Sequence, residues 1–453
     1  MTSLRPWLLI AAILPLAGCG ALSGAAHVAT GLASHQICSA AFVSRIDPQA
    51  FRREAVDPEL GPARWLLRTR VDRAGRSVSA SLLGLATRQA VYRGPSGCLV
   101  LQGAPPPPSP EAIPAPAPRP LAKAPPTAAM YSTMDRAFVE PAKPWRRTKA
   151  VVILHDGQIV GERYASGYGP DTAITGWSAT KSVTNALVGV LVQQGKLSVD
   201  GPAPVAAWKG DSRRAISVDN LLRMTSGLAL GDSLNSSLKS AFDPSARMLF
   251  AERDMAGFAE RQPLAHPPGT SWTYADASPT LTSRIIRDQA GGTEAGMLAF
   301  ARRELFDRIG MEHPTLELDA TGTPLGATHM WASARDWARL GQLYLDDGKV
   351  GGERILPEGW ADYSSRPTPG SPVGYGAGFW TNRGDSPGAH RRIALGMPAD
   401  AFFARGHDGQ YVVIVPSARL VVVRLGITPA PGNDIEGVAR LVREAIAAVG
   451  PPT

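Results

Sequence analysis

Apolar residues in the second half of the chain form two patterns typical of β-hairpins. Residues 151–160 predict a hairpin that turns at Asp156-Gly157. Residues 410–425 predict a second hairpin around Pro416-Ser417. Mostly helical patterns lie between the two hairpins, as at 334–345, and a helical stretch over 435–449 closes the chain. Strands at both ends with helices between them predict one sheet built from distant segments, with a helical subdomain inserted in it.

The first third of the chain follows a different pattern. Short strands predicted near residues 80 and 90, and a turn just before Cys98, indicate a small module over residues 37–103. Residues 105–126 then contain 11 prolines in 22 positions. Because proline neither continues a helix nor donates to a ladder, we expect an extended linker over residues 104–127. A globular domain over residues 128–453 follows it.

An apolar run after Arg5 indicates an export signal. The run is about a dozen residues long, which is too short to span a bilayer permanently. It ends in Leu16-Ala17-Gly18-Cys19, which resembles the bacterial lipoprotein box. We therefore expect a lipoprotein signal peptide over residues 1–18, a lipid on Cys19 and a tether over residues 19–36. The alternative is an ordinary signal peptide with a cysteine near its end.

The three cysteines fit an exported protein. With a lipid on Cys19, Cys38 and Cys98 are left in an oxidising compartment, where a disulfide between them is expected. Two buried free thiols are the alternative. The sequence thus predicts a protein of the bacterial cell envelope that is attached to the membrane through its N-terminal lipid.

The distribution of charge and the spacing of histidines and cysteines indicate whether the chain binds nucleic acid or a metal. The chain has 47 Lys and Arg against 39 Asp and Glu, a net charge of +8. The basic residues are scattered in pairs rather than gathered in a dense stripe, which argues against nucleic acid. No His-Glu-x-x-His, His-x-His or Cys-x-x-Cys occurs, so we expect neither a metal site nor another cofactor.

Candidate chemistry begins at Ser178-Ala179-Thr180-Lys181, which opens an apolar helix ending at Gly195. At a helix start, free amides and the helix dipole favour negative charge that develops on Ser178. Lys181 lies one turn later on the same face. Partial desolvation there is expected to lower its pKa, so that the amine takes the proton of the Ser178 hydroxyl. A second Ser-x-x-Lys begins at Ser236, in a polar stretch that predicts a solvated loop.

The order of several motifs resembles one family of enzymes. The motifs are Leu154-His155-Asp156-Gly157, Glu162-Arg163-Tyr164, Gly176-Trp177-Ser178-Ala179-Thr180-Lys181-Ser182, Leu221-Leu222-Arg223-Met224-Thr225-Ser226-Gly227-Leu228, Pro268-Gly269-Thr270-Ser271-Trp272-Thr273-Tyr274, residues 334–341 and residues 406–410. Together they resemble the serine hydrolases related to class C β-lactamases, penicillin-binding proteins and 6-aminohexanoate-dimer (nylon-oligomer) hydrolases. This resemblance covers most of residues 130–450. It implies an α/β (α+β) fold of the β-lactamase/transpeptidase type, with a central antiparallel sheet flanked by helices and an inserted helical subdomain.

The resemblance also implies a second proton-handling group. Tyr274 stands where the family has the tyrosine of a Tyr-x-Asn motif, so its phenol is expected to relay the proton to the leaving group beside Lys181. The motif here ends in Asp276 instead of asparagine. A carboxylate at this place disfavours an acidic substrate and can pair with Lys181.

The family's third motif corresponds to His407-Asp408-Gly409, because it must follow Tyr274 in the chain. The earlier His155-Asp156-Gly157 is expected to be only a hairpin turn. One amide of the oxyanion hole is that of Ser178, and either His407 or Gln410 donates the other.

Three further residues are candidates for the walls of the pocket. Trp177, next to the nucleophile, is expected to shape a hydrophobic acyl site. His329 and Trp331 fit either the pocket or ordinary packing. The exposed-looking loop residue Asp232 fits a solvated carboxylate better than a substrate ligand.

These residues predict hydrolysis of an ester or amide bond in a small molecule through an acyl-enzyme on Ser178. One alternative is cell-wall chemistry, as a D-Ala-D-Ala peptidase or a β-lactamase, although the missing asparagine counts against it. A second alternative is an envelope-tethered, non-catalytic binding protein on a hydrolase scaffold. The absence of Gly-x-Ser-x-Gly around Ser178 argues against an α/β-hydrolase.

Overall fold

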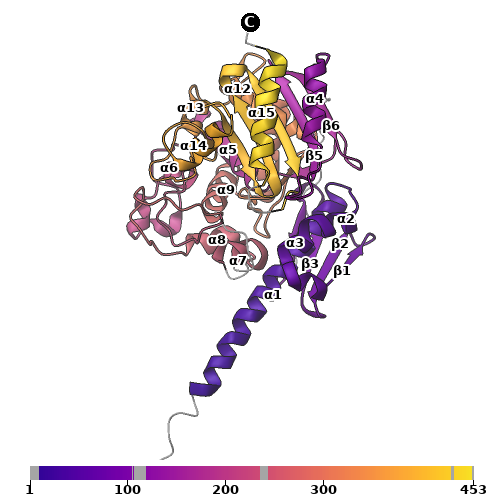
Figure 1. Ribbon diagram of the computed structural model, residues 1–453. Helices are drawn as coiled ribbons and strands as arrows, with labels where there is room; N and C mark the ends of the chain where they lie inside the picture. The colour runs from indigo at the N-terminus through magenta and orange to yellow at the C-terminus, as the bar shows by residue number, and fades with distance from the viewer. Residues whose placement is uncertain (1–9, 105, 107–118, 235–242, 430–432, 451–453) are drawn as a thin grey trace, which may run out of the picture.

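The computed structural model describes residues 10–104, 106, 119–234, 243–429 and 433–450, with side chains described from residue 23 on. Its centre is a six-stranded antiparallel sheet (Figure 1) in the order β12-β13-β14-β15-β5-β6. These strands are β5 (Thr148–His155), β6 (Gln158–Tyr164), β12 (Trp380–Thr381), β13 (Phe402–Gly406), β14 (Gln410–Val415) and β15 (Leu420–Gly426). Both predicted hairpins are present, and β15 pairs with β5. One sheet is therefore built from distant segments, as expected.

The central strands are apolar without interruption because both faces of the sheet are covered. Val152 and Leu154 of β5 belong to the apolar cluster that contains helices α5 and α12. Val151 and Ile153 point the other way, into the cluster that contains helices α4 and α15. Since side chains alternate along a strand, a strand buried on both faces needs apolar residues at every position.

Fifteen α-helices lie in the described part of the chain. They are α1 (Ile10–Phe42), α2 (Pro48–Phe51), α3 (Asp57–Leu60), α4 (Ala128–Ala137), α5 (Thr180–Gln193), α6 (Val218–Leu222), α7 (Pro244–Ala251), α8 (Met255–Glu260), α9 (Ala277–Gln289), α10 (Glu294–Ala301), α11 (Asp307–Ile309), α12 (Ala334–Leu345), α13 (Trp360–Ser365), α14 (Pro387–Ala394) and α15 (Ile435–Val449). The helices predicted over residues 334–345 and 435–449 are confirmed as α12 and α15.

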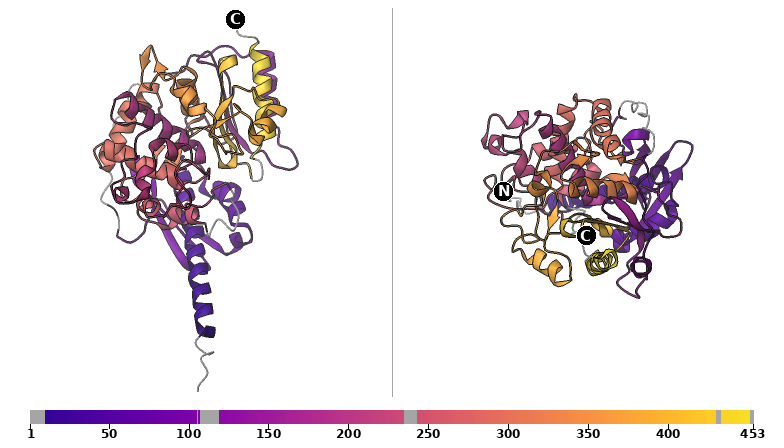
Figure 2. Two further views of the ribbon diagram at one scale, coloured as in Figure 1. Left: turned by 90° about the vertical axis from the view of Figure 1, so that its left-hand side faces the viewer. Right: turned by 90° about the horizontal axis from the view of Figure 1, so that it is seen from above.

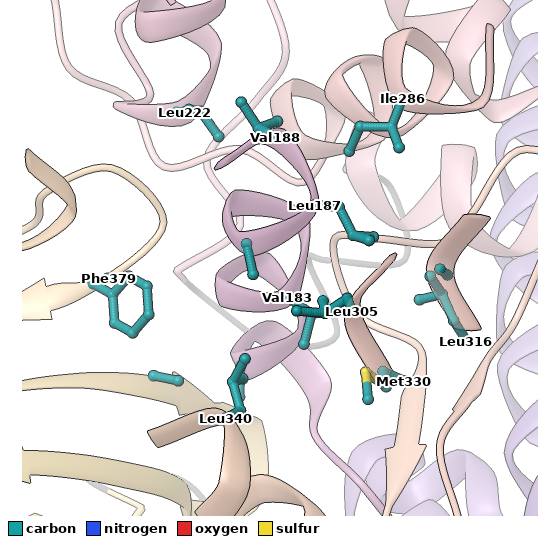
Figure 3. Packing of buried hydrophobic residues seen from close by; sticks show 14 of the residues in the cluster. Val183, Leu187, Val188, Leu222, Ile286, Leu305, Leu316, Met330, Leu340 and Phe379 are labelled. Atoms are coloured by element: carbon teal, nitrogen blue, oxygen red, sulfur yellow. The ribbon is translucent and has the colours of Figure 1, made fainter. Parts of the chain in front are cut away.

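Helix α5 is the centre of the larger apolar core. Twelve of its residues are buried, and Val183, Leu187 and Val188 pack among side chains from several other elements (Figure 3). These neighbours include Ile286 of α9 and Met330 of β9. The start of α5 is therefore held in a fixed place relative to the sheet and to the inserted helices.

Three smaller sheets complete the fold. β7 (Ile174–Thr175), β8 (Thr315–Leu316) and β9 (Met330–Ala332) form a three-stranded sheet beside the start of α5. β10 (Lys349–Val350) and β11 (Glu353–Arg354) form a short hairpin. β1 (Leu67–Asp72), β2 (Ser77–Leu82), β3 (Leu85–Tyr92) and β4 (Cys98–Val100) form the antiparallel sheet of the N-terminal module. This last sheet lies within residues 37–103, where the small module is predicted.

The tether expected over residues 19–36 is wrong, because these residues belong to α1 and several are buried from Val28 on. The segment shows no helical period because small residues let α1 pack closely on more than one side. A Cβ on Gly31, for example, would collide with the backbone of Phe250 in α7. Towards its N-terminus α1 projects away from the body of the molecule (Figure 2).

The predicted signal peptide and lipid site fall at the outer end of α1. Residues 1–9 lie outside the described residues, and for residues 10–22, which include Cys19, only the backbone is described. The lipid therefore stays a prediction. No helix in the described part of the chain combines the length and the apolar character needed to cross a membrane.

A disulfide cross-links the N-terminal module, and ion pairs connect the module to the part of the chain that contains the six-stranded sheet. A disulfide joins Cys38 of α1 to Cys98 of β4. Ion pairs then connect the module to the rest of the chain, with 2.8 Å between Arg93 and Glu294 and 2.7 Å between Glu54 and Lys149.

The expected linker is not a free spacer along its whole length. Lys123 forms a parallel bridge with Ile159 of β6, and the amide of Ala124 donates to the carbonyl of Ile159. This short pairing is possible because residues 121–124 are free of proline and retain their amide donors. Most of the proline-rich segment, residues 107–118, lies outside the described residues.

Candidate active site

Ser178 lies in a single 3-10 turn, Trp177–Ala179, that leads directly into α5. Helix α5 ends as predicted, with Gly195 in the left-handed conformation after the last turn. Lys181 lies in the first turn of α5, and its Nζ is 2.8 Å from Ser178 Oγ. The helix start thus brings together a partly exposed hydroxyl and a buried amine.

The ammonium of Lys181 is fully satisfied. Its side chain is 2% exposed, and Nζ donates to Ser178 Oγ, to the carbonyl of Ala327 at 2.8 Å and to Asp276 Oδ1 at 2.6 Å. An ammonium has three protons, and each has an acceptor here. Lys181 is therefore held in its charged form.

The expectation that desolvation lowers the pKa of Lys181 is wrong. Burial does lower it, but the charge of Asp276 and the phenol of Tyr274 outweigh burial and raise the pKa above its ordinary value. The sequence showed that Asp276 replaces the expected asparagine, but it did not show that its carboxylate touches the amine. In the resting site Lys181 is a proton donor to Ser178.

Tyr274 and Asp276 come from the loop that leads into α9. The ring of Tyr274 is almost fully buried, and its centroid lies 4.9 Å from Lys181 Nζ. The ring also belongs to an aromatic cluster with Trp272, Tyr375 and Trp380. The structure therefore brings together Ser178, Lys181, Tyr274 and Asp276, as the resemblance implied.

Trp177 is held in a backbone conformation that L-residues rarely adopt, with φ of 46°. Its partly exposed ring contacts two imidazoles, those of His407 at 5.4 Å and His329 at 5.8 Å between ring centroids. Behind it, the end of β13 lies directly against the turn of the nucleophile. A Cβ on Gly406 would collide with the carbonyl oxygen of Gly176.

His407 is the first residue of the turn between β13 and β14. Its Nε2 lies 2.8 Å from Glu59 of α3 and 3.4 Å from Asp408. Burial lowers the pKa of His407, but the charges of Asp408 and Glu59 and the hydrogen bond to Glu59 raise it to about 9. Burial raises the pKa of Asp408 to about 6. His407 is thus a cation beside Trp177 at neutral pH.

Glu59, His407 and Asp408 are also a group whose ligand atoms could surround a metal ion, since they lie within 4.8 Å of one another. A metal needs a neutral imidazole as its ligand. The two carboxylates favour the protonated imidazole instead. We therefore interpret the group as an ion-pair cluster.

Gln410 has a structural role. Its side chain is fully buried and joins the turn to β15, donating to the carbonyl of Gly426 at 2.7 Å and accepting from the amide of Gly426 at 3.1 Å. It also donates to the carbonyl of His407 at 3.1 Å. The side chain therefore shapes the His407 turn and is not open to a substrate.

His329 and Trp331 differ in their roles. Trp331 is fully buried, and its indole donates to Glu317 at 3.1 Å, which makes it a packing residue. His329 is also buried, but its ring reaches Trp177. Burial and the charges of His35 and Lys181 lower the pKa of His329 well below its ordinary value, so it is neutral.

Two residues of the N-terminal module support this site and were not found from the sequence. Gln36 of α1 lies 2.9 Å from His329 Nε2, and Glu59 holds His407. Gln36 and His329 are 293 positions apart in the sequence, and Glu59 and His407 are 348 positions apart. No local sequence pattern therefore links Gln36 or Glu59 to Ser178. Sequences of relatives in which both residues of a pair change together are the signal that could reveal these contacts.

The fold and the site define a class of protein. A central antiparallel sheet, an inserted helical subdomain and a Ser-x-x-Lys at a helix start beside a buried tyrosine are all present. The family model described as Beta-lactamase matches residues 134–446. The chain belongs to the beta-lactamase family, and the predicted β-lactamase/transpeptidase-like fold is confirmed.

Individual proteins match this chain at low sequence identity. An uncharacterized protein of Mycobacterium tuberculosis is 29% identical over 234 residues, which are 41% of this chain and 57% of that protein. The match thus spans little more than half the length of this curated relative. A 6-aminohexanoate-dimer hydrolase of Paenarthrobacter ureafaciens is 22% identical over 309 residues, 63% of this chain and 74% of that enzyme. The solved structure of a family VIII carboxylesterase has a TM-score of 0.54 at 16% identity, covering 72% and 99% of the two chains.

Proposed function

We propose that this protein hydrolyses an ester or amide bond in a small molecule through an acyl-enzyme on Ser178. The observation that carries the proposal is the 2.8 Å hydrogen bond between Lys181 Nζ and Ser178 Oγ, at the start of a buried helix. No metal or organic cofactor is needed for this chemistry. Members of the beta-lactamase family are serine hydrolases, and the proteins similar to this chain include a 6-aminohexanoate-dimer hydrolase and, in fold, a family VIII carboxylesterase.

The Lys181–Asp276 pair supplies the base. As Ser178 Oγ bonds to the acyl carbon, Lys181 passes one proton to Asp276 across 2.6 Å and accepts the hydroxyl proton of Ser178. The amide of Ser178 stabilises the oxyanion. When the tetrahedral intermediate collapses, the leaving group departs with a proton returned by Lys181 and Tyr274.

The second half of the reaction repeats these transfers with water. Water attacks the acyl carbon and gives its proton to the same pair, and the acid leaves as Ser178 Oγ takes the proton back.

Two features favour uncharged esters and amides over cell-wall peptides or β-lactams. Asp276 places a carboxylate where the family motif has asparagine, and the third motif contains neither lysine nor threonine.

We further propose that the protein works in the bacterial cell envelope, on a lipid attached to Cys19. The lipoprotein-like box before Cys19 supports this location. The Cys38–Cys98 disulfide supports it as well, because disulfides persist in oxidising compartments.

The proposal is tested with a fluorophosphonate, which phosphonylates activated serines. We expect one adduct by intact mass, mapped to Ser178, and hydrolysis of short-chain p-nitrophenyl esters that falls about 10³-fold or more in Ser178→Ala. Ser236→Ala is the matched control, because Ser236 opens the second Ser-x-x-Lys of the chain and lies outside the described residues. This control should keep both the adduct and the activity.

Two outcomes overturn the proposal in different ways. Folded protein that takes no adduct and hydrolyses no ester is a binding protein on a hydrolase scaffold. Rapid acylation of Ser178 by a fluorescent penicillin, with no ester hydrolysis, assigns the protein to cell-wall chemistry.

A further inference from the structure

Four exposed apolar side chains gather at one end of the N-terminal module. Trp65 is 79% exposed, Leu85 73%, Leu83 61% and Leu66 42%. Among the described residues nine large apolar side chains are exposed, and these four include the two most exposed. The amide of Leu83 donates to the carbonyl of Leu66 at 3.0 Å, so the β2–β3 turn and the start of β1 form one surface. We call these four residues the apolar tip.

The surroundings of the apolar tip are basic. Arg64 stacks its guanidinium 4.8 Å from the centroid of Trp65, and Arg68 is exposed on β1. Asp72, the one acidic residue between residues 60 and 104, lies at the opposite end of β1, so Arg64 and Arg68 are not neutralised by a carboxylate of this sheet. A surface of tryptophan, leucine and arginine suits the interface of an anionic bilayer, where the indole sits among headgroups and arginine meets phosphate.

The apolar tip lies where α1 leaves the body of the module. Thr30 of α1 donates to the carbonyl of Ala86, next to Leu85, at 2.6 Å. Residues 23 and 24 of α1 are already exposed, and nothing lies within 4 Å of a Cβ on Gly24. Residues 19–26, from the predicted lipid site to this part of α1, contain no charged side chain. The hydrogen bond between Thr30 and Ala86 therefore places the β2–β3 turn beside the part of α1 that leaves the module.

We propose that the apolar tip, with Arg64 and Arg68, rests in the headgroup region of an anionic lipid bilayer and fixes how the enzyme stands on the membrane. This goes beyond an N-terminal anchor, because an anchor alone leaves the body free to turn. Cys19 lies eleven residues before Thr30, the α1 residue that bonds beside Leu85, which is about 16 Å along a helix that rises 1.5 Å per residue. A lipid on Cys19 would thus hold α1 at a depth from which the tip reaches the bilayer surface.

The experiment uses the full chain on vesicles of phosphatidylcholine with about 30% phosphatidylglycerol, a content chosen to give a strongly negative surface. The emission of Trp65 is taken as the difference between the native protein and Trp65→Phe. We expect lipids brominated near the headgroup to quench this emission at least twofold. Arg64→Glu with Arg68→Glu should abolish the quenching, because the acidic side chains are repelled by the headgroups.

The matched control is Tyr131→Ser with Val139→Ser, which removes two exposed apolar side chains far from the tip in sequence, 60% and 59% exposed. Quenching of Trp65 should be unchanged in this control. Co-sedimentation with vesicles reports the N-terminal anchor independently. Protein that sediments without quenching of Trp65 overturns the docking of the tip and leaves the anchor standing. Self-association in solution that disappears in Trp65→Ser assigns the tip to a second copy of this chain and also overturns the proposal.

Discussion

The key residue of the site is a buried ammonium that touches its nucleophile. Lys181 is 2% exposed and has three acceptors, so it cannot take a proton until it has given one away. In the described part of the chain, Asp276 is the only carboxylate that Lys181 bonds. Because the pair holds one shared proton, its ability to act as a base should depend little on the pH of the solvent.

This leads to a prediction about pH. We expect the rate of Ser178 phosphonylation in the native protein to be nearly flat between pH 6 and 8.5. In Asp276→Asn the rate should rise with pH over the same range, because the carboxylate that most strongly opposes the effect of burial on the pKa of Lys181 is gone and Lys181 must lose its proton to solvent. Stopped-flow labelling with a fluorophosphonate measures both profiles.

The control for this prediction is Asp232→Asn, which changes an exposed carboxylate in the loop before residue 235. Its profile should stay flat. If the native protein itself showed a rate that climbs steadily with pH, Lys181 would act as an ordinary free amine and the shared-proton mechanism would be wrong.

At the scale of elements, the site depends on the close approach of β13 to the turn that carries Ser178. Gly406 ends β13 and lies against Gly176 and Trp177, so no side chain fits there. This approach also places the His407 turn beside Trp177. A change of one methyl group at position 406 should therefore move the strand away from the nucleophile.

We expect Gly406→Ala to lower the free energy of unfolding by about 1–3 kcal/mol, the usual cost of overpacking, and to slow labelling of Ser178. Its φ of −125° suits alanine, so the effect is purely steric. Gly210→Ala is the control, because a Cβ there has nothing within 4 Å. Urea unfolding measures both variants, and an equal stability of the two would show that β13 does not press on the turn.

The elements were largely predictable, and the reason is visible in their residues. The hairpins at Asp156-Gly157 and Pro416-Ser417 carry strong turn signals between apolar runs, and α12 and α15 have clear helical spacing. Helix α1 was not predictable in the same way. Because α1 packs against other elements on several sides, its sequence lacks the periodic apolar pattern of an amphipathic helix. Its small residues, taken alone, are typical of a flexible segment.

At the scale of the whole molecule, the N-terminal part of the chain contributes to the candidate active site. Glu59 and Gln36 reach His407 and His329, and both imidazoles contact Trp177 next to the nucleophile. The proximity of Ser178 and Lys181 could be predicted from their spacing at a helix start, and the place of the His407 turn from the order of the motifs. The support from the module could not, because it rests on contacts between segments that are far apart in the chain.

The His407 cluster predicts how stability depends on pH. The pKa of His407 is raised from 6.5 to about 9 by Asp408 and Glu59 against burial, and Arg405 also faces it and lowers its pKa. The folded state therefore holds a proton that the unfolded state lacks between these values. The stabilisation is complete below pH 6.5 and is lost as the pH rises to about 9.

We expect the free energy of unfolding in urea to fall from pH 6.5 to 9, and to fall less in Glu59→Gln, which removes one of the two carboxylates. Glu54→Gln is the matched control, because Glu54 pairs with Lys149 at the same junction and does not bond His407. An identical pH slope in Glu59→Gln and the native protein would show that the module does not set the charge of His407.

Because residues of the N-terminal module contact residues far along the sequence, the order of synthesis affects when the candidate site can form. The ribosome makes Gln36 and Glu59 early, but His329 and His407 come 293 and 348 residues later. A chain released before β14 and β15 contains Ser178 and Lys181 but lacks the middle of the sheet beneath them. We therefore expect incomplete translation products to lack a reactive Ser178, and reactivity to arise only once β14 and β15 have been added.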